Sequence, residues 1–505
     1  MSLLGIDIGT TGCKTALFSH QGETLATTYT EYDAQSAKPG WAELDSLYIW
    51  GMIKASIREV VSRTPADPVQ AISISSLGEA VVPVSSDHRI LGPSILNFDV
   101  RGEEYLADLH ETLKDEHLYQ INGNTLGNHY SLTKLIWIKE HQPDLYEQAH
   151  KFLHWSGFVS FMLGADPMID YSLANRTLLF DLDKEDWSDE LLNHARLDRD
   201  KLPAAVPSGS VIGKISPHIA VDLGLTPDTV IVAGPHDQCA NAVGCGVIDA
   251  GGAVFGMGTY VCITPVFTER RSPDIMVEKG INTEHHAVPG RYVSFLYNQG
   301  GSIVKWFRDT YAAAEHQQAA ATGQDIYATL FSEIPADPSN IVVLPHFQTT
   351  GPPDFISDSS GVMAGIRLET TRGDILKGII EGITYYLREV VDSLPPTGIK
   401  ITHYRAAGGG SQSDVWVQTC ADILGTPITR PKITEAGALG AAIMSGVGSG
   451  AFKSHEEGVQ AMVKMEQTFE PDFKKHERYN CWYEKYRQLW PLMQAYLRDL
   501  VSETR

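Results

Sequence analysis

The chain has little of what would mark a membrane, secreted or metal-cluster protein. It holds six cysteines in 505 residues, and no two of them form a Cys-x-x-Cys pair, so neither a zinc cluster nor a disulfide framework is indicated. No apolar run is long enough to span a membrane, and the N-terminus lacks the basic and apolar pattern of a signal peptide. We therefore expect a cytoplasmic protein with reduced thiols that are mostly buried.

Basic charge is also scarce. Lysine and arginine number 40 against 62 acidic residues, which gives a formal net charge of -22. Nucleic acid and anionic lipid both require a basic surface, so neither is an expected partner. The apolar fraction of 43% is ordinary, and a chain of this length exceeds what one hydrophobic core supports. Two large domains are expected.

A glycine turn between two apolar runs opens the chain. "SLLGIDI" and "CKTALFS" read as strands, and "GTTG" at residues 9 to 12 supplies the turn. Backbone amides and threonine hydroxyls in such a turn can bind phosphate, because glycine lets the backbone approach closely. Asp7 beside the turn can hold Mg²⁺ or its waters. An ordinary hairpin with a buried polar residue is the alternative, since short glycine motifs also arise by chance.

The same pattern occurs again near the middle of the chain. "DIGTTGCKTALF" at residues 7–18 and "GMGTYVCITPVF" at residues 256–267 share Gly-Thr-x-x-Cys-x-Thr-x-x-Phe. Two such hairpins in two similar halves would hold a triphosphate between them. Only one half then needs a carboxylate for the metal, which accounts for Asp7 in the first copy and Gly256 in the second. Chance similarity of two hairpins is the alternative.

A polar triplet, His236-Asp237-Gln238, follows a predicted strand in "TVIVAGPHDQ". A carboxylate exposed by a turn at the end of a strand is well placed to act as a general base in an α/β protein. The alternative is that Asp237 caps the helix that follows, which is common for aspartate. Both roles are compatible.

Three glycines lie between a short strand and an amphipathic helix in "YRAAGGGSQSDVW", residues 404–416. A base or a ribose could lie on this turn. The dinucleotide-binding pattern G-x-G-x-x-G is missing after the first strand, so that fold is excluded. "EAGALGAAIMSG", residues 435–446, predicts a second helix of small residues. We expect it to pack tightly beneath the glycine turn.

In this order, the stretches resemble the FGGY family of carbohydrate kinases, within the actin-like, hexokinase-like ATPase superfamily. The likeness runs from residue 3 to about residue 450 and includes "GWAELDSLYIW" at 40–50, "LNFDVRG" at 96–102, "NQGGSIVKWFRD" at 298–309 and "GVMAGIRLETTRGDILKGIIEGI" at 361–383. It implies an α/β fold of two ribonuclease-H-like domains with a deep interdomain cleft. The implied divisions are residues 1–248, residues 249–450, and a helical tail, 451–505, that packs on the second domain.

The resemblance also implies ATP and Mg²⁺ as cofactors, and a role for each matching residue. Asp237 matches the catalytic base that removes a proton from the substrate hydroxyl, and Asp7 matches the Mg²⁺-associated carboxylate. Substrate binding is implied for Gly78, Glu79, Asp99, Tyr130 and Gln238, although Glu79 and Asp99 could instead order the site. The implied nucleotide contacts are Gly9, Thr10 and Thr11 in the first domain, and Gly258, Thr259, Gly301, Gly409, Gly410 and Ser413 in the second.

The identity of the substrate is less constrained. Glycerol kinases of the family usually carry Arg-Glu where this chain has Gly78-Glu79, and xylulokinases usually carry Met-His. Gly78 argues against glycerol, so we expect a xylulokinase-like enzyme for a small sugar or polyol: a pentulose, a hexulose or an alditol. Glycerol or gluconate kinase activity is the alternative within the family, and a homodimer is a further expectation. A non-kinase ATP-binding switch or sugar sensor is the alternative of another class, but a sensor does not need Asp237.

Overall fold

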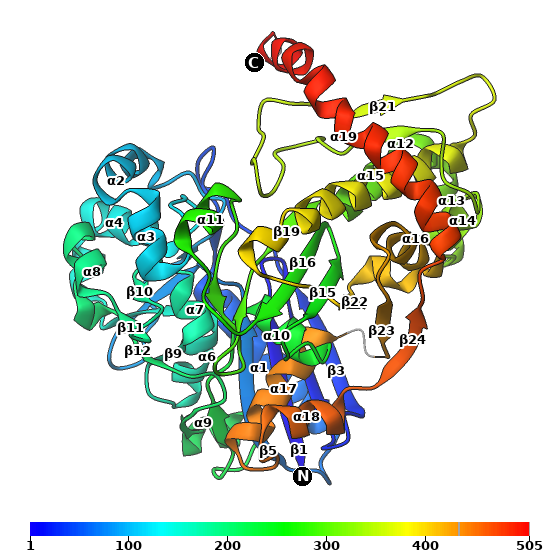
Figure 1. The fold of residues 1–505 in the computed structure, drawn as a ribbon. Helices are drawn as coiled ribbons and strands as arrows, with labels where there is room; N and C mark the ends of the chain where they lie inside the picture. The colour runs from blue at the N-terminus through cyan, green and yellow to red at the C-terminus, as the bar shows by residue number, and fades with distance from the viewer. Residues whose placement is uncertain (433–434, 504–505) are drawn as a thin grey trace.

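Two mixed β-sheets lying side by side form the framework of the molecule (Figure 1). The computed structural model describes residues 1–432 and 435–503. The first sheet has the order β13-β14-β5-β1-β2-β3, in which β1–β3 are antiparallel and β5 and β14 run parallel to β1. Its strands are β1 (Ser2–Ile8), β2 (Gly12–Phe18), β3 (Thr24–Glu31), β5 (Val69–Ser76), β13 (Val211–Lys214) and β14 (Val230–Val232).

The second sheet repeats this plan. Its order is β17-β18-β16-β15-β22-β23-β24, with β19 also paired to β16, and β22 and β23 run parallel to β15. Its strands are β15 (Gly252–Met257), β16 (Tyr260–Phe267), β17 (Glu284–His285), β18 (Tyr292–Val293), β19 (Leu296–Gln299), β22 (His403–Ala407), β23 (Ile428–Pro431) and β24 (Met465–Phe469). The two matching sequence stretches therefore occupy equivalent hairpins, β1–β2 and β15–β16.

The two hairpins differ in register by one residue. Asp7 pairs with Lys14 across the first hairpin, whereas Gly256, the equivalent of Asp7, pairs with Cys262 across the second. The reason is the length of the turn, because residues 9–11 connect β1 to β2 whereas only residues 258–259 connect β15 to β16. The cysteines that align in the sequence therefore do not occupy equivalent positions in the two sheets.

Helices cover both sheets and fill the two lobes seen in Figure 1. Those of the first half are α1 (Ser46–Ser62), α2 (Leu106–Leu113), α3 (Asp115–Asn122), α4 (Ser131–His141), α5 (Pro143–Gln148), α6 (Trp155–Leu163), α7 (Tyr171–Asn175), α8 (Asp189–Ala195), α9 (Pro217–Leu223) and α10 (Asp237–Gly244). Those of the second half are α11 (Pro273–Glu278), α12 (Gly301–Tyr311), α13 (Ala313–Thr322), α14 (Ile326–Ser332), α15 (Arg372–Asp392), α16 (Asp414–Leu424), α17 (Ala436–Gly448), α18 (His455–Met462) and α19 (Phe473–Ser502). Within the described ranges, no helix has both the length and the apolar character needed to cross a membrane.

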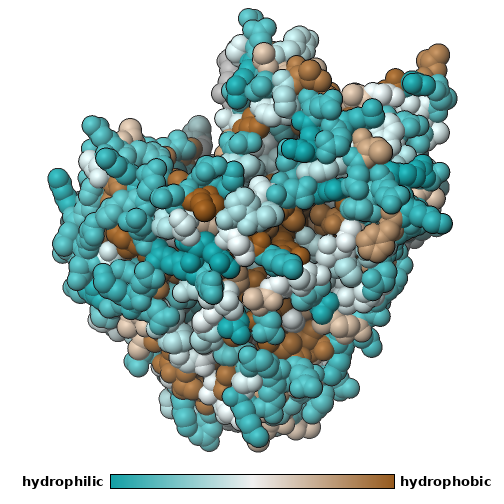
Figure 2. All heavy atoms as spheres, viewed as in Figure 1, coloured by the Kyte–Doolittle hydropathy of each residue, from teal (hydrophilic) through white to brown (hydrophobic). Residues whose placement is uncertain are grey.

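Short strands complete the two lobes outside the main sheets. They pair as β4 (Glu43–Leu44) with β7 (Ser94–Ile95), β6 (Val81–Val84) with β8 (Lys151–His154), β9 (Met168–Asp170) with β12 (Ala204–Val206), β10 (Phe180–Asp181) with β11 (Asp186–Trp187), and β20 (Val342–Leu344) with β21 (Val362–Ala364). Figure 2 shows a largely hydrophilic surface that is hollowed between the two lobes at the top of the view.

Helices α10 and α17 each follow a parallel strand and pack against one another. A Cβ added at Gly440 would lie 1.9 Å from the Ala240 carbonyl oxygen, and one at Gly244 would lie 1.9 Å from the Ala436 oxygen. Helix α17 also contacts β1, β5 and β2. The expectation that this helix packs beneath the glycine turn was therefore wrong. It covers the first sheet instead, because its small residues allow backbone-to-backbone contact there.

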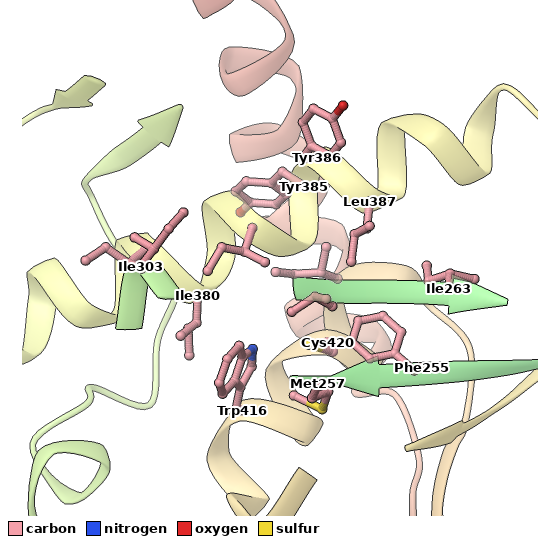
Figure 3. Close-up of a cluster of buried hydrophobic side chains, with 14 of the residues drawn as sticks. Phe255, Met257, Ile263, Ile303, Ile380, Tyr385, Tyr386, Leu387, Trp416 and Cys420 are labelled. Carbon is pink, nitrogen blue, oxygen red and sulfur yellow. The ribbon is translucent and has the colours of Figure 1, made fainter. Parts of the chain in front are cut away.

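The core of the second half lies between its sheet and α15 (Figure 3). A capping box formed by Thr371 and Asp374 begins α15, which buries apolar side chains along its length. Helix α19 packs on α15 and α16 and buries Tyr479, Tyr483 and Tyr486 in this core. All six cysteines are free, and the four at positions 13, 239, 245 and 420 are buried.

A segment of the second half crosses to the first. Helix α11 lies beside α3, and the Tyr119 hydroxyl donates to the Ile281 carbonyl at 3.0 Å. The His285 amide donates to Asn175 Oδ1 at 3.0 Å. The strand β17 is thereby held against α7, and this contact brings side chains of both halves to one place.

Candidate active site

The first glycine turn, residues 9–12, presents free hydrogen-bond donors at the end of β1. Tyr32 fixes the turn by donating from its hydroxyl to the Gly9 carbonyl at 2.7 Å and from its amide to the Thr11 carbonyl at 3.1 Å. Within the described part of the chain, the amides of Thr10 and Thr11 donate no hydrogen bond. Such donors can bind a phosphate group.

Asp7 lies at the same end of β1, and its Oδ1 accepts a hydrogen bond from Ser75 Oγ at 2.7 Å. Burial, assisted by the charge of Glu435, raises the pKa of Asp7 to about 6, although Ser75 and Lys14 act in the opposite direction. Lys14 and Glu435 form an ion pair at 2.9 Å. A Cβ at Gly437 would meet Asp7 Oδ2 at 2.2 Å, so the first turn of α17 reaches this carboxylate.

Asp237 is the first residue of α10, and His236 is the N-cap, without a capping hydrogen bond from its side chain. The suggestion that Asp237 caps this helix was therefore wrong. Among the described residues, Asp237 Oδ1 has no hydrogen-bond partner, although His236 Nε2 lies 3.2 Å away. Burial lowers the pKa of His236 well below its usual range, so the ring is neutral and forms no ion pair with Asp237.

The pKa of Asp237 is raised to about 7 by burial and by the nearby charges of Asp7 and Glu79. Burial also raises the pKa of Cys262 on β16, and the charge of Asp237 adds to that shift. Asp237 is therefore electrostatically coupled both to Asp7 on the first hairpin and to the second hairpin. A carboxyl group with a free oxygen and a pKa near neutrality can act as a general base.

Arg176, at the end of α7, joins the two halves of the molecule. Its Nε donates to Glu79 Oε1 at 2.8 Å, its Nη2 contacts the same oxygen, and its Nη1 donates to Glu284 Oε1 at 2.6 Å. Glu79 follows β5 in the first half, whereas Glu284 lies in β17 of the second. A Cβ at Gly78 would lie 3.0 Å from Arg176 Cγ and from the His236 ring. The missing side chain at residue 78 therefore leaves space that Arg176 and His236 use.

Asp99 is enclosed, and its side chain has 0% of its surface exposed. Its Oδ2 accepts a hydrogen bond from the Ala42 amide at 2.5 Å, and Arg101 donates to both carboxylate oxygens. Burial alone would raise the pKa of Asp99, but these hydrogen bonds hold it below its usual value. Of the two roles considered for Asp99, this geometry favours ordering of the site over direct contact with a substrate.

Tyr130 and Gln238 lie next to the residues just described. Tyr130 is buried, its hydroxyl donates to Asn124 Oδ1 at 3.0 Å, and the Arg176 guanidinium lies 4.9 Å from the centre of its ring. Tyr130 therefore supports Arg176. Gln238 is half-buried beside Asp237, and within the described ranges its side chain makes no hydrogen bond. Its amide is therefore free to bind a hydroxyl.

The second glycine turn, residues 258–260, is joined to the N-terminus of α12. The Gly301 amide donates to the Gly258 carbonyl at 3.0 Å, and the amides of Gly300 and Ser302 donate to the Thr259 carbonyl at 3.2 and 3.1 Å. Thr259 itself is exposed. The structure thus brings together Gly258, Thr259 and Gly301, which lie in two separate sequence stretches.

The three-glycine turn lies against the same place. A Cβ at Gly410 would meet Trp416 Cζ3 at 2.8 Å and Met257 Cβ at 3.0 Å, and Figure 3 shows these two side chains next to each other. Ser413 is the N-cap of α16 and accepts a hydrogen bond from the Trp416 amide at 3.3 Å. A Cβ at Gly409 would meet nothing within 4 Å. The turn is therefore packed on one side and open at Gly409.

Asp7 is the residue that would contact a magnesium ion. In residues 1–432 and 435–503, no group of three or more His, Cys, Asp or Glu side chains is arranged to hold a metal ion. In nucleotide sites, however, Mg²⁺ is bound by one or two carboxylates together with phosphates and water. A cation beside Asp7 would favour the ionised form of a carboxyl group whose pKa burial raises, so this residue fits an ion that arrives with a nucleotide.

Both halves of the chain match one protein family. Residues 2–244 match the N-terminal domain of the FGGY family of carbohydrate kinases, and residues 261–449 match its C-terminal domain. The chain belongs to this family. The predicted family resemblance, the enzyme class and the α/β fold with two sheet domains are thereby confirmed.

Relatives of this FGGY kinase carry different names. It is 28% identical to the xylulose kinase of Bacillus subtilis (strain 168), over 97% of this chain and 96% of the relative. It is 29% identical to the autoinducer-2 kinase of Escherichia coli (strain SMS-3-5 / SECEC), over 94% and 92%. Among solved structures, the xylulose kinase from Rhodospirillum rubrum matches with a TM-score of 0.87 and 25% identity, over 98% of this chain and 100% of that chain. Identities at this level leave the substrate open.

Two residues of this FGGY kinase site, Arg176 and Glu284, were not predicted from the sequence. They lie in two separate stretches, "DYSLANRTLLFD" and "INTEHHAV". A charged residue in a stretch with few other charged residues can indicate a buried ion pair, because arginine and glutamate are rarely buried unless they are paired. The pairing itself depends on the crossing of β17 to the first half, which no local pattern predicts.

Proposed function

We propose that this kinase transfers the γ-phosphoryl group of ATP to a hydroxyl of a neutral pentulose, hexulose or alditol, as a xylulokinase-like enzyme of the cytoplasm. The observation that carries the proposal is Asp237. Its Oδ1 is free of protein partners, and its pKa is raised to about 7. A general base that takes a proton near neutral pH needs both properties.

The chemistry follows from the residues around Asp237. The carboxylate removes the proton as the substrate oxygen attacks the γ-phosphorus, and Gln238 binds a neighbouring hydroxyl. The free amides of Thr10 and Thr11 would hold phosphate oxygens, and Asp7 would hold Mg²⁺, which would supply the positive charge that neutralises the phosphates. Phosphoryl transfer depends mainly on such positioning and charge neutralisation. The turns at Gly301 and Gly409 form the nucleotide side.

The charge around Asp237 favours a neutral acceptor. Asp7 and Glu79 both raise the pKa of Asp237. Glu284 is a further buried carboxylate, and Arg176 is the cation that Glu79 and Glu284 share. Because Arg176 already contacts two carboxylates, an aldonate would bring one more negative charge to an acidic site. This argues against gluconate as the acceptor.

Two alternatives use the same residues. Glycerol or gluconate phosphorylation would need a different fit at Gly78 and Glu79, and gluconate would also need its negative charge to be balanced. A sugar sensor would bind ATP and sugar without turnover, but it would have no use for a general base at Asp237. The raised pKa of this residue therefore favours the kinase.

A coupled ADP-release screen tests the proposal. Purified enzyme, ATP and Mg²⁺ would be tested against pentuloses, hexuloses, alditols, glycerol and aldonates, with Asp237→Asn as the control for contaminating kinases. We expect the highest kcat/KM with a pentulose, a hexulose or an alditol. Turnover confined to glycerol or to aldonates would select the alternative within the family, and sugar binding without ADP release would select the sensor.

A further inference from the structure

Arg176 has a fixed backbone and therefore a fixed starting point for its side chain. Helix α7 is capped by Asp170, whose carboxylate accepts hydrogen bonds from the Ser172 and Leu173 amides at 3.0 Å each. Asn175 donates to the Asn122 carbonyl at 3.0 Å and accepts from the His285 amide at the same distance. The residue directly before Arg176 is thus bonded to both halves of the molecule.

The Arg176 side chain is enclosed, with 11% of its surface exposed. Its guanidinium lies between Glu79 and Glu284, 4.9 Å from the centre of the Tyr130 ring and 5.8 Å from that of Phe295. Two carboxylates and two rings therefore define one orientation for the guanidinium. A planar group with several donors is suited to such a two-sided contact, and a lysine ammonium is not.

The contact with Arg176 uses only one oxygen of Glu79. Both guanidinium donors meet Oε1, and within the described ranges Glu79 Oε2 accepts no hydrogen bond. A Cβ at Gly78, the residue before Glu79, would lie 3.0 Å from the His236 ring, and His236 Nε2 lies 3.2 Å from Asp237 Oδ1. Glu79 therefore belongs to the region around Asp237 where the acceptor would lie. An ionised carboxylate oxygen fixed in this way is a strong acceptor for a hydroxyl group.

We propose that Arg176 is a positioning residue of the sugar site: it fixes Glu79 so that Oε2 accepts one hydroxyl of the acceptor, and it depends on Glu284 of the second half to do so. The inference rests on the proposed function and deepens it. It makes sugar recognition sensitive to the contact between the two halves, because one side of the guanidinium is held by each half. It also gives Gly78 a role, since a side chain there would displace Arg176 or His236.

The test compares Arg176→Met, Arg176→Lys, Glu284→Gln and Gly78→Ala with Arg58→Met, which removes an exposed ion pair to Asp222. The acceptor is the best sugar of the ADP-release screen. We expect Arg176→Met to raise the KM for the sugar by about 10- to 100-fold, the range of a charge-assisted hydrogen bond, with the KM for ATP changed less than about threefold. Arg176→Lys and Glu284→Gln should give smaller increases, and Arg58→Met none.

Monodeoxy analogues of the same sugar separate positioning from simple support of the fold. For the analogue that lacks the hydroxyl bound by Glu79, wild type and Arg176→Met should have the same KM, whereas the other analogues should keep the difference. If Arg176→Met does not fold, the role of Arg176 is tested by the sugar KM values of Gly78→Ala and Glu284→Gln, since both variants keep the arginine.

An unchanged sugar KM in the folded variants, or an equal loss with every deoxy analogue, would overturn the role of Arg176. A wild-type enzyme that releases no ADP with any acceptor contradicts the proposed function instead. In that case the role of Arg176 is tested by sugar binding alone, measured as the rise in unfolding temperature that the same sugars produce in wild type and in the variants. A wild type that neither binds nor phosphorylates any of them overturns both.

Discussion

The Ser75 hydroxyl donates to Asp7 Oδ1 at 2.7 Å, so two neighbouring parallel strands share one carboxylate at their common edge. The other oxygen, Asp7 Oδ2, faces the first turn of α17, where a Cβ at Gly437 would lie 2.2 Å from it. A carboxylate beside bound phosphate is repulsive unless a cation lies between them, and this sets the first expectation.

Asp7→Asn should weaken the dependence of the rate on Mg²⁺ and lower kcat, while the fold stays intact. The reason is that a neutral amide still accepts the Ser75 hydrogen bond but binds a divalent cation poorly. A Mg²⁺ titration of the rate, together with thermal unfolding, measures both effects. Ser75→Ala, which removes the hydrogen bond to Asp7 but keeps the carboxylate, should lower kcat less than Asp7→Asn does. An Mg²⁺ dependence identical to that of wild type would remove Asp7 from the metal site.

Asp237→Asn should lower turnover by roughly a hundredfold or more, as expected for loss of a general base. The binding of ATP and sugar should change little, because Asp237 makes no hydrogen bond through Oδ1 in the described protein. Steady-state rates and calorimetric titrations check the two statements. Asp222→Asn, a surface acid paired to Arg58, is the control. Near-normal turnover in Asp237→Asn would refute the mechanism.

The pH dependence should report the same group. Because the pKa of Asp237 is raised to about 7, kcat/KM for the sugar should rise with pH and level off above about 7, as the base loses its proton. The sign for stability is the reverse. Because the pKa of Asp237 is raised from 3.8 to about 7 on folding, the unfolded chain loses this proton first, so stability falls as the pH rises between these two values and levels off above about 7. Asp237→Asn should therefore unfold at a higher temperature than wild type at pH 8 but not at pH 4. A pH–rate profile that is flat between these values would contradict the assignment.

Gly440→Ala should destabilise the protein by about 1–3 kcal/mol or more, since the new methyl group meets a backbone oxygen that cannot move aside. The added Cβ would lie 1.9 Å from the Ala240 carbonyl oxygen. Gly51→Ala on α1 is the matched control, because its Cβ meets nothing within 4 Å and alanine favours a helix. Thermal and urea unfolding of the two variants should shift in opposite directions. Equal stability of the two would show that α10 and α17 are not in close contact.

Gly409→Ala tests the nucleotide side. Its Cβ would enter open space, so stability should stay unchanged. If the nucleotide lies on this turn, the methyl group occupies part of its place, and the KM for ATP should rise several-fold while the KM for the sugar stays the same. Kinetics with each substrate varied in turn measure both. A rise in the sugar KM alone would move the nucleotide away from Gly409.

The parts of the fold that local patterns specify were predicted from the sequence. The hairpin β1–β2, the strand and helix around Asp237, and the unit β22–glycine turn–α16 each follow from apolar runs separated by glycine. What failed depended on contacts between distant segments. Helix α17 was expected beneath the glycine turn, but its small residues fit equally well against β1, and composition cannot choose between two surfaces.

The candidate site was predicted to a similar extent. Asp7 lies near the end of β1, and Asp237 and Gln238 follow β14. These two strands flank β5 and run parallel to it in one sheet, so the three residues come to the same edge. For Asp99 two roles were predicted, substrate contact or ordering of the site. The sequence could not choose between them, because the letters "FDVR" do not specify that its carboxylate pairs with Arg101 and the Ala42 amide. The one-residue difference between the two hairpins was equally hidden, because a shorter turn shifts the register without changing the aligned residues.

Helices α10 and α17 meet through glycines, and this contact has a mechanical consequence. At these glycines the two helix backbones touch directly, and no side chains interdigitate there to oppose a relative movement of the helices. The two helices follow equivalent parallel strands of the two sheets, β14 and β23, and Asp237 is the first residue of α10. A rotation of one half against the other about this contact would keep Asp237 close to the rotation axis. Such a rotation would displace the outer parts of the two lobes more than it displaces the carboxylate of Asp237.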